Sequence, residues 1–298
     1  MYKEAIKDAI SMHELPSKWQ PDLLVEAQKV TKKKKAAKYR KDLRNLPFAT
    51  IDGADAKDFD DAVYCIKNAT DYKLFVAIAD VSFYVEPGSK LDNEAKKRGT
   101  SIYFPGTVIP MLPESLSNGI CSLRPNEDRC SMICEMTISS DGKRKKYKFY
   151  SGLINSKARL TYNQVENHLR DKASKINDAK VRNSIDTLKS LTNLRLKLRN
   201  QRKALEINPK ETILELGKNK EVNNIRIKKS LFAHKLVEES MLLANESAAE
   251  FMHDRLDLGV YRVHEDPDPS KLEALKNHFK ISAPVSYTHL TLPTKVRV

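Results

Sequence analysis

Five aspartates lie within ten residues of one another, in the segment Ile51-Asp-Gly-Ala-Asp-Ala-Lys-Asp-Phe-Asp-Asp-Ala62. Like charges at this spacing repel one another, and a surface loop has no structural need for so many of them. A divalent cation resolves the conflict, because carboxylate oxygens are the hard ligands that Mg²⁺ and Ca²⁺ prefer. An EF-hand calcium loop is a poor match, since Gly53 precedes most of the acids and no glutamate closes the loop. A solvated acidic turn is the alternative interpretation of the spacing.

The charge of the whole chain adds to what the acidic segment indicates. Lys and Arg number 53 against 39 Asp and Glu, a net charge of +14. A surplus of that size favours a polyanionic partner, either nucleic acid or an anionic membrane surface, although many basic proteins have no such partner. Clustered carboxylates can accept phosphate groups if metal ions screen the charge, as in two-metal phosphodiester hydrolysis. The basic surplus would then guide an anionic strand toward the site.

Short runs typical of β-strands stand on both sides of the acidic segment. Phe48–Ile51 precedes it and Ala62–Ile66 follows it. A third run, Leu74–Ala79, is apolar throughout, which indicates a strand covered on both faces. Asn68–Asp71 has the composition of a turn between the second and third strands. The acidic segment is therefore expected to be a loop at the end of a sheet.

A long hairpin and several helices complete the expected elements. The Asp141-Gly142 pair, between two alternating runs, predicts a hairpin over residues 130–150. Apolar residues at a helical period predict helices over Pro21–Val30, 174–205 and Leu231–Phe251, the second of them rich in Lys and Arg. Strands first and helices later predict a mixed α/β (α+β) domain.

The apolar runs and the cysteines argue against a membrane protein, a secreted protein and a zinc-binding protein. No run of about 18 apolar residues occurs, so no membrane span is expected, and the charged N-terminus lacks the apolar stretch of a secretory signal. The cysteines lie in apolar or strand-like segments: Cys65, Cys121, Cys130 and Cys134. Such cysteines are typical of buried thiols in a reducing compartment, and the C-x₃-C pair is a poor zinc signal. We expect a cytoplasmic protein that does not associate with membranes.

The acidic segment is similar to the catalytic signature of the ribonuclease II/ribonuclease R (RNB) family. Other segments resemble that family in the same order, namely Val76–Ser82, Arg98–Pro105, Ile109–Glu114, Leu116–Gly119, Cys121–Leu123, Ala158–Tyr162, His234–Glu239, Leu243–Asn245 and Tyr261–His264. The resemblance runs from about residue 12 to about residue 280, and its details are closer to ribonuclease R than to ribonuclease II. It implies an RNB-type catalytic domain with a β-rich core around the active site and surrounding helices, incomplete at the C-terminus.

The resemblance also implies an activity. Members are hydrolytic 3′→5′ exoribonucleases that degrade single-stranded RNA to nucleoside 5′-monophosphates, with Mg²⁺ as cofactor and Mn²⁺ as a substitute. By resemblance, Asp52, Asp58, Asp60 and Asp61 are catalytic and hold the metal. Asp52 and Asp61 would bind it directly, Asp60 would position a second ion or the attacking water, and Asp58 would complete the acidic cage. The expected partner is the 3′ end of single-stranded RNA, bound by a monomer.

Three further residues are expected to contact RNA. Tyr103 matches the tyrosine on which the family stacks the 3′-terminal base, which suits a sequence-tolerant enzyme. One of Glu238 and Glu239 is expected near the terminal ribose, where 2′-OH contacts separate RNA from DNA. The alternative interpretation of Tyr103 is a core aromatic, and that of Glu238 and Glu239 is a solvated helix face. A second stacking phenylalanine is expected near residues 204–208, where this sequence has Ile207.

The chain is expected to divide into an N-terminal helix and linker (1–45), a partial RNB-like catalytic domain (46–284) and a non-native tail (285–298), for which a genuine strand is the alternative. The family's later Thr-Ser-Pro-Ile-Arg-Arg-Tyr segment is absent. In the family this segment supplies an arginine to the scissile phosphate. Losing such a charge-stabilising group costs on the order of 10²–10³ in rate, so weak or no activity is expected of this chain. A non-catalytic RNA-binding fragment or pseudo-enzyme, and a calcium-binding structural domain, are the competing hypotheses.

Overall fold

The computed structural model of the chain describes residues 2–32, 39–170, 174–203, 212–217, 222–227, 230–257, 259, 263 and 265–282. The chain forms two compact units, Met1–Ala244 and Asn245–Val298. The division falls within helix α7 (Phe232–Leu256). The second unit contains α8 (Pro269–Ser282), and the first contains all the other elements described below.

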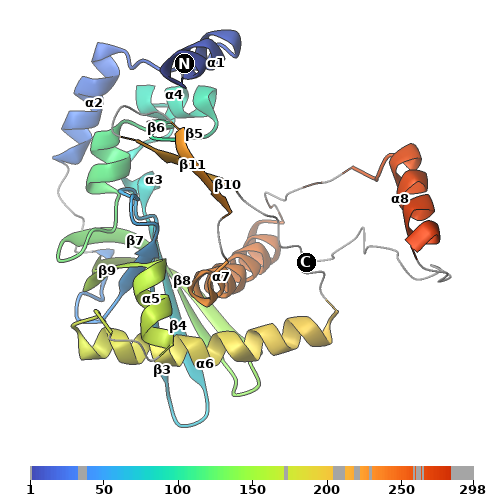
Figure 1. Cartoon of the computed structure of the whole chain (residues 1–298). Coiled ribbons are helices and arrows are strands. Elements are labelled where there is room, and N and C mark those ends of the chain that lie inside the picture. Colours follow the sequence, from blue (N-terminus) through green and yellow to red (C-terminus); the bar gives the residue numbers. More distant parts are fainter. Residues whose placement is uncertain are drawn as a thin grey trace. The chain divides into compact units, whose positions relative to one another are not determined.

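A seven-stranded mixed sheet forms the centre of the first unit, in the strand order β1-β8-β7-β4-β3-β2-β9 (Figure 1). Its strands are β1 (Lys41–Asp42), β2 (Ala49–Asp52), β3 (Asp61–Lys67), β4 (Tyr72–Ala79), β7 (Asp128–Ile138), β8 (Arg144–Asn155) and β9 (Ala158–Thr161). Neighbouring strands are antiparallel, except that β1 is parallel to β8 and β2 is parallel to β9. Two further hairpins pair β5 (Ile102–Phe104) with β6 (Thr107–Ile109), and β10 (Thr212–Leu216) with β11 (Val222–Ile227).

Helices pack on both faces of the central sheet, and β4 shows why. Leu74 and Val76 belong to one buried cluster, whereas Phe75 and Ala77 belong to another, because successive side chains of a strand point to opposite faces. The first cluster also takes in apolar residues of α5 (Tyr162–Leu169), α6 (Ala179–Gln201) and the first half of α7. The second takes in residues of α2 (Pro21–Thr31), α3 (Val81–Tyr84), α4 (Lys90–Arg98) and the short helical turn η2 (Ser115–Ile120). The expected mixed α/β fold and the doubly covered strand are confirmed.

The turn between β7 and β8 docks against α6, which Figure 1 shows lying across the sheet. Gly142 has φ +86°, and a Cβ added there would lie 3.1 Å from Cβ of Leu194. Arg195 donates a hydrogen bond through Nη1 to the carbonyl oxygen of Gly142, at 3.2 Å. The predicted Asp-Gly hairpin is therefore confirmed, and its glycine is required both by the turn and by close packing.

The helix α1 covers Tyr2–Met12, and α2 matches the predicted helix at Pro21–Val30. Within the described residues, no helix combines the length and the apolar character needed to cross a bilayer. The four cysteines are buried and free, as expected. The position of Ile207 and the segment 285–298 lie outside the described residues.

Candidate active site

The acidic segment joins two neighbouring strands at one end of the sheet. β2 ends at Asp52, and β3 begins at Asp61. These strands are antiparallel neighbours, with Ala49 opposite Val63. The end of one strand and the start of the next therefore lie at the same end of the sheet, which brings Asp52 and Asp61 together. On its other side β2 is paired over its whole length with β9, where Asp52 lies opposite Thr161.

Arg159 on β9 fixes the beginning of the acidic loop. Its Nη2 donates hydrogen bonds to the carbonyl oxygens of Gly53 and Ala54, each at 2.7 Å. Its guanidinium also lies over the ring of Phe59, 5.5 Å from the ring centroid. A single side chain from the strand beside β2 therefore contacts both the first turn of the loop and the buried aromatic near its end.

Ser122 fixes the end of the same loop. Its Oγ accepts a hydrogen bond from the N–H of Phe59 at 3.0 Å and donates to the carbonyl oxygen of Lys57 at 2.9 Å. The N–H of Leu123 donates to the carbonyl oxygen of Phe59 at 2.8 Å. Phe59 itself is buried and anchors the loop in the core. The backbone that carries the acidic side chains is thus held at both ends.

Three of the four predicted catalytic aspartates have raised pKa values. Burial, followed by the negative charges of Asp52 and Asp60, raises the pKa of Asp61 to about 6. The pKa of Asp60 is raised by partial burial of its carboxyl group and by repulsion from Asp58 and Asp52. Burial also raises the pKa of Asp52, to which the charge of Asp58 adds. The predicted set of four therefore lies close enough for its members to repel one another.

Tyr103 lies beside the acidic set, on the small β5–β6 hairpin. Its hydroxyl donates a hydrogen bond to Oδ2 of Asp58 at 3.2 Å. Partial burial and the charge of Asp58 raise the pKa of the phenol. The side chain is nevertheless 66% exposed, so its ring is open to a ligand. The residue predicted to stack on a base therefore contacts Asp58, one of the residues predicted to be catalytic.

Tyr162 links α7 to the acidic set. Burial and the charges of Asp52 and Asp61 raise its pKa to about 12. Its ring stacks on that of His234, with centroids 4.1 Å apart and planes 19° apart. His234 lies in the first turn of α7, and Glu238 follows one turn later on the same side of the helix. The stack holds His234 by packing against Tyr162.

Glu238 and Glu239 differ in their surroundings. The side chain of Glu239 is 2% exposed and accepts a hydrogen bond from Nη1 of Arg199 at 2.8 Å. Nε of Arg195 lies 3.5 Å from its other oxygen. Glu238 is about half exposed and accepts from Arg199 at 2.8 Å. Of the two predicted ribose contacts, Glu238 has the surface that a ligand could reach.

The donor set suits a hard divalent cation held together with substrate. Carboxylate oxygens are appropriate ligands, and a cation would offset the repulsion that raises their pKa values. Within the part of the chain that the structure describes, no group of three or more His, Cys, Asp or Glu side chains is placed to hold an ion by itself. Mg²⁺ is commonly bound by one or two carboxylates, waters and substrate phosphates rather than by a complete protein cage.

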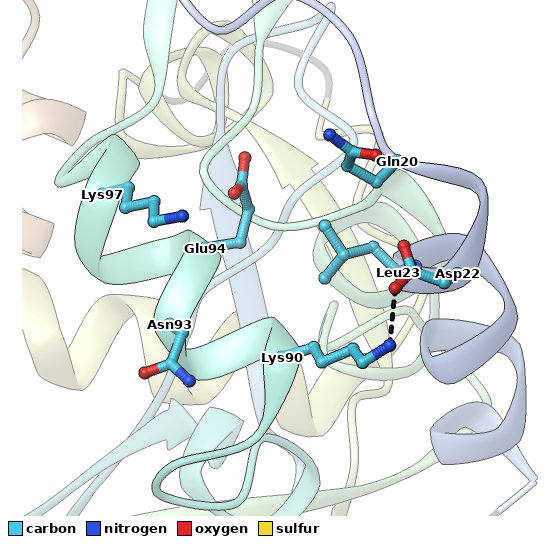
Figure 2. A pocket seen from close by; sticks show the side chains of 7 residues that line it. All are labelled: Gln20, Asp22, Leu23, Lys90, Asn93, Glu94 and Lys97. Carbon is cyan, nitrogen blue, oxygen red and sulfur yellow. Dashed lines mark hydrogen bonds and ion pairs between the residues drawn. The ribbon is translucent and has the colours of Figure 1, made fainter.

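A polar pocket between α2 and α4 is separate from this site (Figure 2). It is lined by Gln20, Asp22, Leu23, Lys90, Asn93, Glu94 and Lys97. Nζ of Lys90 and Oδ2 of Asp22 form an ion pair across it, at 2.6 Å. None of the predicted site residues lines this pocket, and the ion-paired side chains of Lys90 and Asp22 are 65% and 55% exposed.

The chain is similar to known proteins over most of its length. The family model described as RNB domain matches residues 40–295. Ribonuclease R of Escherichia coli (strain K12) is 42% identical over 277 residues, which cover 92% of this chain and 34% of that protein. Ribonuclease R of Thermotoga maritima is 43% identical over 282 residues, covering 92% of this chain and 40% of that protein. The chain thus spans about a third of the length of the first of these relatives.

Solved structures agree in fold. Mycoplasma genitalium RNase R in complex with ribose methylated single-stranded RNA has a TM-score of 0.87 at 33% identity, over 93% of this chain and 44% of that one. Yeast Ssd1, a pseudonuclease, has a TM-score of 0.65 at 16% identity, over 82% of this chain and 30% of that one. The second likeness concerns the fold alone, so the fold does not by itself decide whether a chain is catalytic.

Proposed function

Because the chain belongs to the RNB domain family, we propose that it acts in hydrolytic 3′→5′ degradation of single-stranded RNA, releasing nucleoside 5′-monophosphates. The observation that supports this most is the position of Asp52, Asp58, Asp60 and Asp61 between β2 and β3, where burial and the charges of neighbouring members raise the pKa values of Asp52, Asp60 and Asp61. A sequence without catalytic use for these carboxylates would gain by losing their mutual repulsion. The exposed ring of Tyr103, hydrogen-bonded to Asp58, supports a strand end held beside them.

The proposal includes a divalent cation, Mg²⁺ with Mn²⁺ as a substitute. Asp52 and Asp61 would hold it directly, because Asp52 ends β2 and Asp61 begins β3 at the same end of the sheet. When bound, the cation supplies Lewis-acid chemistry that lowers the pKa of a water molecule and offsets charge on the leaving oxygen. Asp60 would accept hydrogen bonds from the attacking water and orient it, while Asp58 would complete the acidic set and hold the hydroxyl of Tyr103.

Other side chains would bind and orient the RNA. Stacking on Tyr103 accepts any base, because every base has a π-face. Glu238 would contact the terminal ribose, with Glu239 and Arg199 holding it in place. We further propose that the protein acts as a monomer in the cytoplasm, where its buried free thiols stay reduced.

A cleavage assay tests the proposal. The purified chain is incubated with a 5′-labelled single-stranded RNA and Mg²⁺, beside Asp60→Asn and a matched control, Asp22→Asn. Asp22 is an exposed carboxylate that pairs with Lys90 and has no part in the proposed site. We expect a ladder of products shortened from the 3′ end that forms slowly, with nucleoside 5′-monophosphates released, in keeping with the weak activity expected of this chain. Asp60→Asn should lower the rate by about 10²-fold or more, whereas Asp22→Asn should not change it.

Two results would refute the proposal. Release of products with 3′-phosphates would show a different chemistry, and cleavage unaffected by Asp60→Asn would place the activity elsewhere. Binding of the RNA 3′ end without cleavage in Mg²⁺ or Mn²⁺ would instead favour a non-catalytic RNA-binding chain.

A further inference from the structure

A buried carboxylate outside the acidic site is surrounded by three lysines. Glu135 lies in the middle of β7, and its side chain is 4% exposed. The hydroxyl of Tyr150 donates to its Oε2 at 2.6 Å. Nζ of Lys73 lies 2.8 Å from Oε1, and Nζ of Lys148 and Lys41 lie 3.2 and 3.8 Å from Oε2. We call Lys41, Lys73 and Lys148, together with Glu135, the lysine cluster.

Strand register places the lysine cluster on one face of the sheet. Glu135 is opposite Phe75 on β4 and Lys148 on β8, and Lys41 is opposite Gly152 on β8. Residues directly opposite each other share a face, and so do residues two apart along one strand. Lys73 lies two residues from Phe75 on β4, and Gly152 lies four residues from Lys148 on β8. Side chains from four different parts of the sequence therefore form one surface.

The lysine cluster carries more positive charge than its carboxylate needs. Burial alone would raise the pKa of Glu135, but hydrogen bonds from Lys73, Tyr150 and Lys148 lower it to about 2. Glu135 is therefore ionised, and three ammonium groups face one carboxylate, a surplus of two positive charges. Lys73 and Tyr150 already satisfy Glu135, whereas Lys41 at 3.8 Å is beyond hydrogen-bonding distance.

The ammonium groups are both held in place and open to solvent. The side chains of Lys41, Lys73 and Lys148 are 54%, 38% and 56% exposed. Nζ of Lys41 and of Lys148 lie 4.9 and 5.7 Å from the ring centroid of Tyr150, which fixes their positions further. Each ammonium has three N–H donors, and one carboxylate with two oxygens cannot accept from all nine. Donors therefore remain for an anionic ligand.

We propose that the lysine cluster binds phosphodiester groups of single-stranded RNA, as a contact separate from the acidic site. The inference rests on the proposed function for the choice of RNA as the anion. Asp61 lies opposite Ile78, and Lys73 precedes Ile78 by five residues on β4. At roughly 3.4 Å per residue this is about 17 Å along the strand, so the cluster contacts a long RNA and not a short one held at the acidic end.

The test removes the surplus charge and keeps Glu135 paired. The double variant Lys41→Gln/Lys148→Gln leaves Lys73 and Tyr150 on the carboxylate and brings the cluster to zero net charge. Its matched control, Lys90→Gln/Lys143→Gln, also removes two positive charges, from exposed lysines that pair with Asp22 and Asp141. Binding of 5′-labelled oligouridylates is measured in EDTA over a range of salt concentrations, so that no cleavage occurs.

We expect the cluster double variant to bind a long oligouridylate about three- to tenfold more weakly at moderate salt. The slope of log affinity against log salt should fall by about 1.4, because each phosphate contact on a single strand contributes about 0.7. Binding of a uridine trinucleotide should not change. Lys41→Arg/Lys148→Arg, which keeps the charges, should bind as the unchanged chain does.

The outcomes separate this inference from the proposed hydrolysis. An equal loss of affinity in the two double variants would overturn it, since net charge alone would then explain the effect. Failure of the unchanged chain to bind long RNA more tightly than the trinucleotide would also overturn it. Absence of cleavage in Mg²⁺ with the expected binding pattern in EDTA would refute the hydrolysis and leave the lysine cluster supported.

Discussion

Replacing Arg159 by methionine removes two hydrogen bonds to the acidic loop and keeps an aliphatic chain over Phe59. The bonds lost are those from Nη2 to the carbonyl oxygens of Gly53 and Ala54. A hydrogen bond from a charged group contributes about 1.5–3 kcal/mol when buried, and these two are part-buried and exposed. A combined loss of about 1–2 kcal/mol in the ordering of the loop is therefore expected.

The effect on rate follows from the position of the loop. It carries Asp58 and Asp60, and a displacement of about 1 Å in a catalytic group costs on the order of 10² in rate. We expect kcat of Arg159→Met to fall about 10- to 100-fold. The KM for RNA should change little, because Tyr103 stands on a separate hairpin. Arg159 also lowers the pKa of Asp52, so the acid limb of the pH–rate profile should move to higher pH in the variant.

Arg182 offers a matched control on α6. Its Nη1 also donates to two successive carbonyl oxygens, those of Ile176 and Asn177, at 2.5 and 2.9 Å. Arg182→Met should lose a similar amount of stability without losing activity. The assay is steady-state cleavage of labelled RNA over a range of RNA concentrations and of pH at saturating Mg²⁺, with thermal unfolding of each variant. An unchanged kcat in Arg159→Met, or equal losses in both variants, would refute the positioning role of Arg159.

Two further predictions concern the site itself. Tyr103→Ala should weaken binding of an RNA 3′ end in EDTA by about 1–3 kcal/mol, whereas Tyr103→Phe should keep most of the affinity. Equal binding by Tyr103→Ala and the unchanged chain would contradict stacking. The pKa of Asp61 is about 6 in the folded state and near 3.9 in the unfolded state. The folded state therefore binds the proton more tightly, and metal-free protein should lose up to about 3 kcal/mol of its free energy of unfolding as pH rises from about 4 to about 6. Asp61→Asn should abolish that loss in pH-dependent urea unfolding, and an unaltered pH dependence would refute the assignment.

Short-range patterns predicted most of the elements that position the acidic set. The alternation around Asp141-Gly142 and the apolar run at Leu74–Ala79 depend on neighbouring residues, and both are confirmed. Boundaries were less accurate. The helix predicted from residue 174 begins at Ala179, because the carboxylate of Asp178 accepts hydrogen bonds from the N–H groups of Lys180 and Val181 and caps it there.

Contacts between distant segments could not be predicted from the spacing of residue types along the sequence. Arg159 and Ser122 lie in segments that resemble the family, yet their roles depend on carbonyl and N–H groups more than 60 residues away in sequence. The lysine cluster arises from the register of β1, β8, β7 and β4, which periodicity does not fix. Arg159 could have been identified as a basic residue on the strand that pairs with β2, which ends at Asp52.

The parallel pairing of β2 with β9 has a consequence for how the protein is made. During synthesis, Asp52 leaves the ribosome long before its strand partner, and Arg159 follows Gly53 by 106 residues. Such long-range contacts form late in folding, because the intervening chain must first be ordered. A nascent chain that ends before Ala158 therefore has all five aspartates but lacks the strand and the arginine that hold their loop. The acidic loop is completed late, after the β7–β8 hairpin has been synthesised.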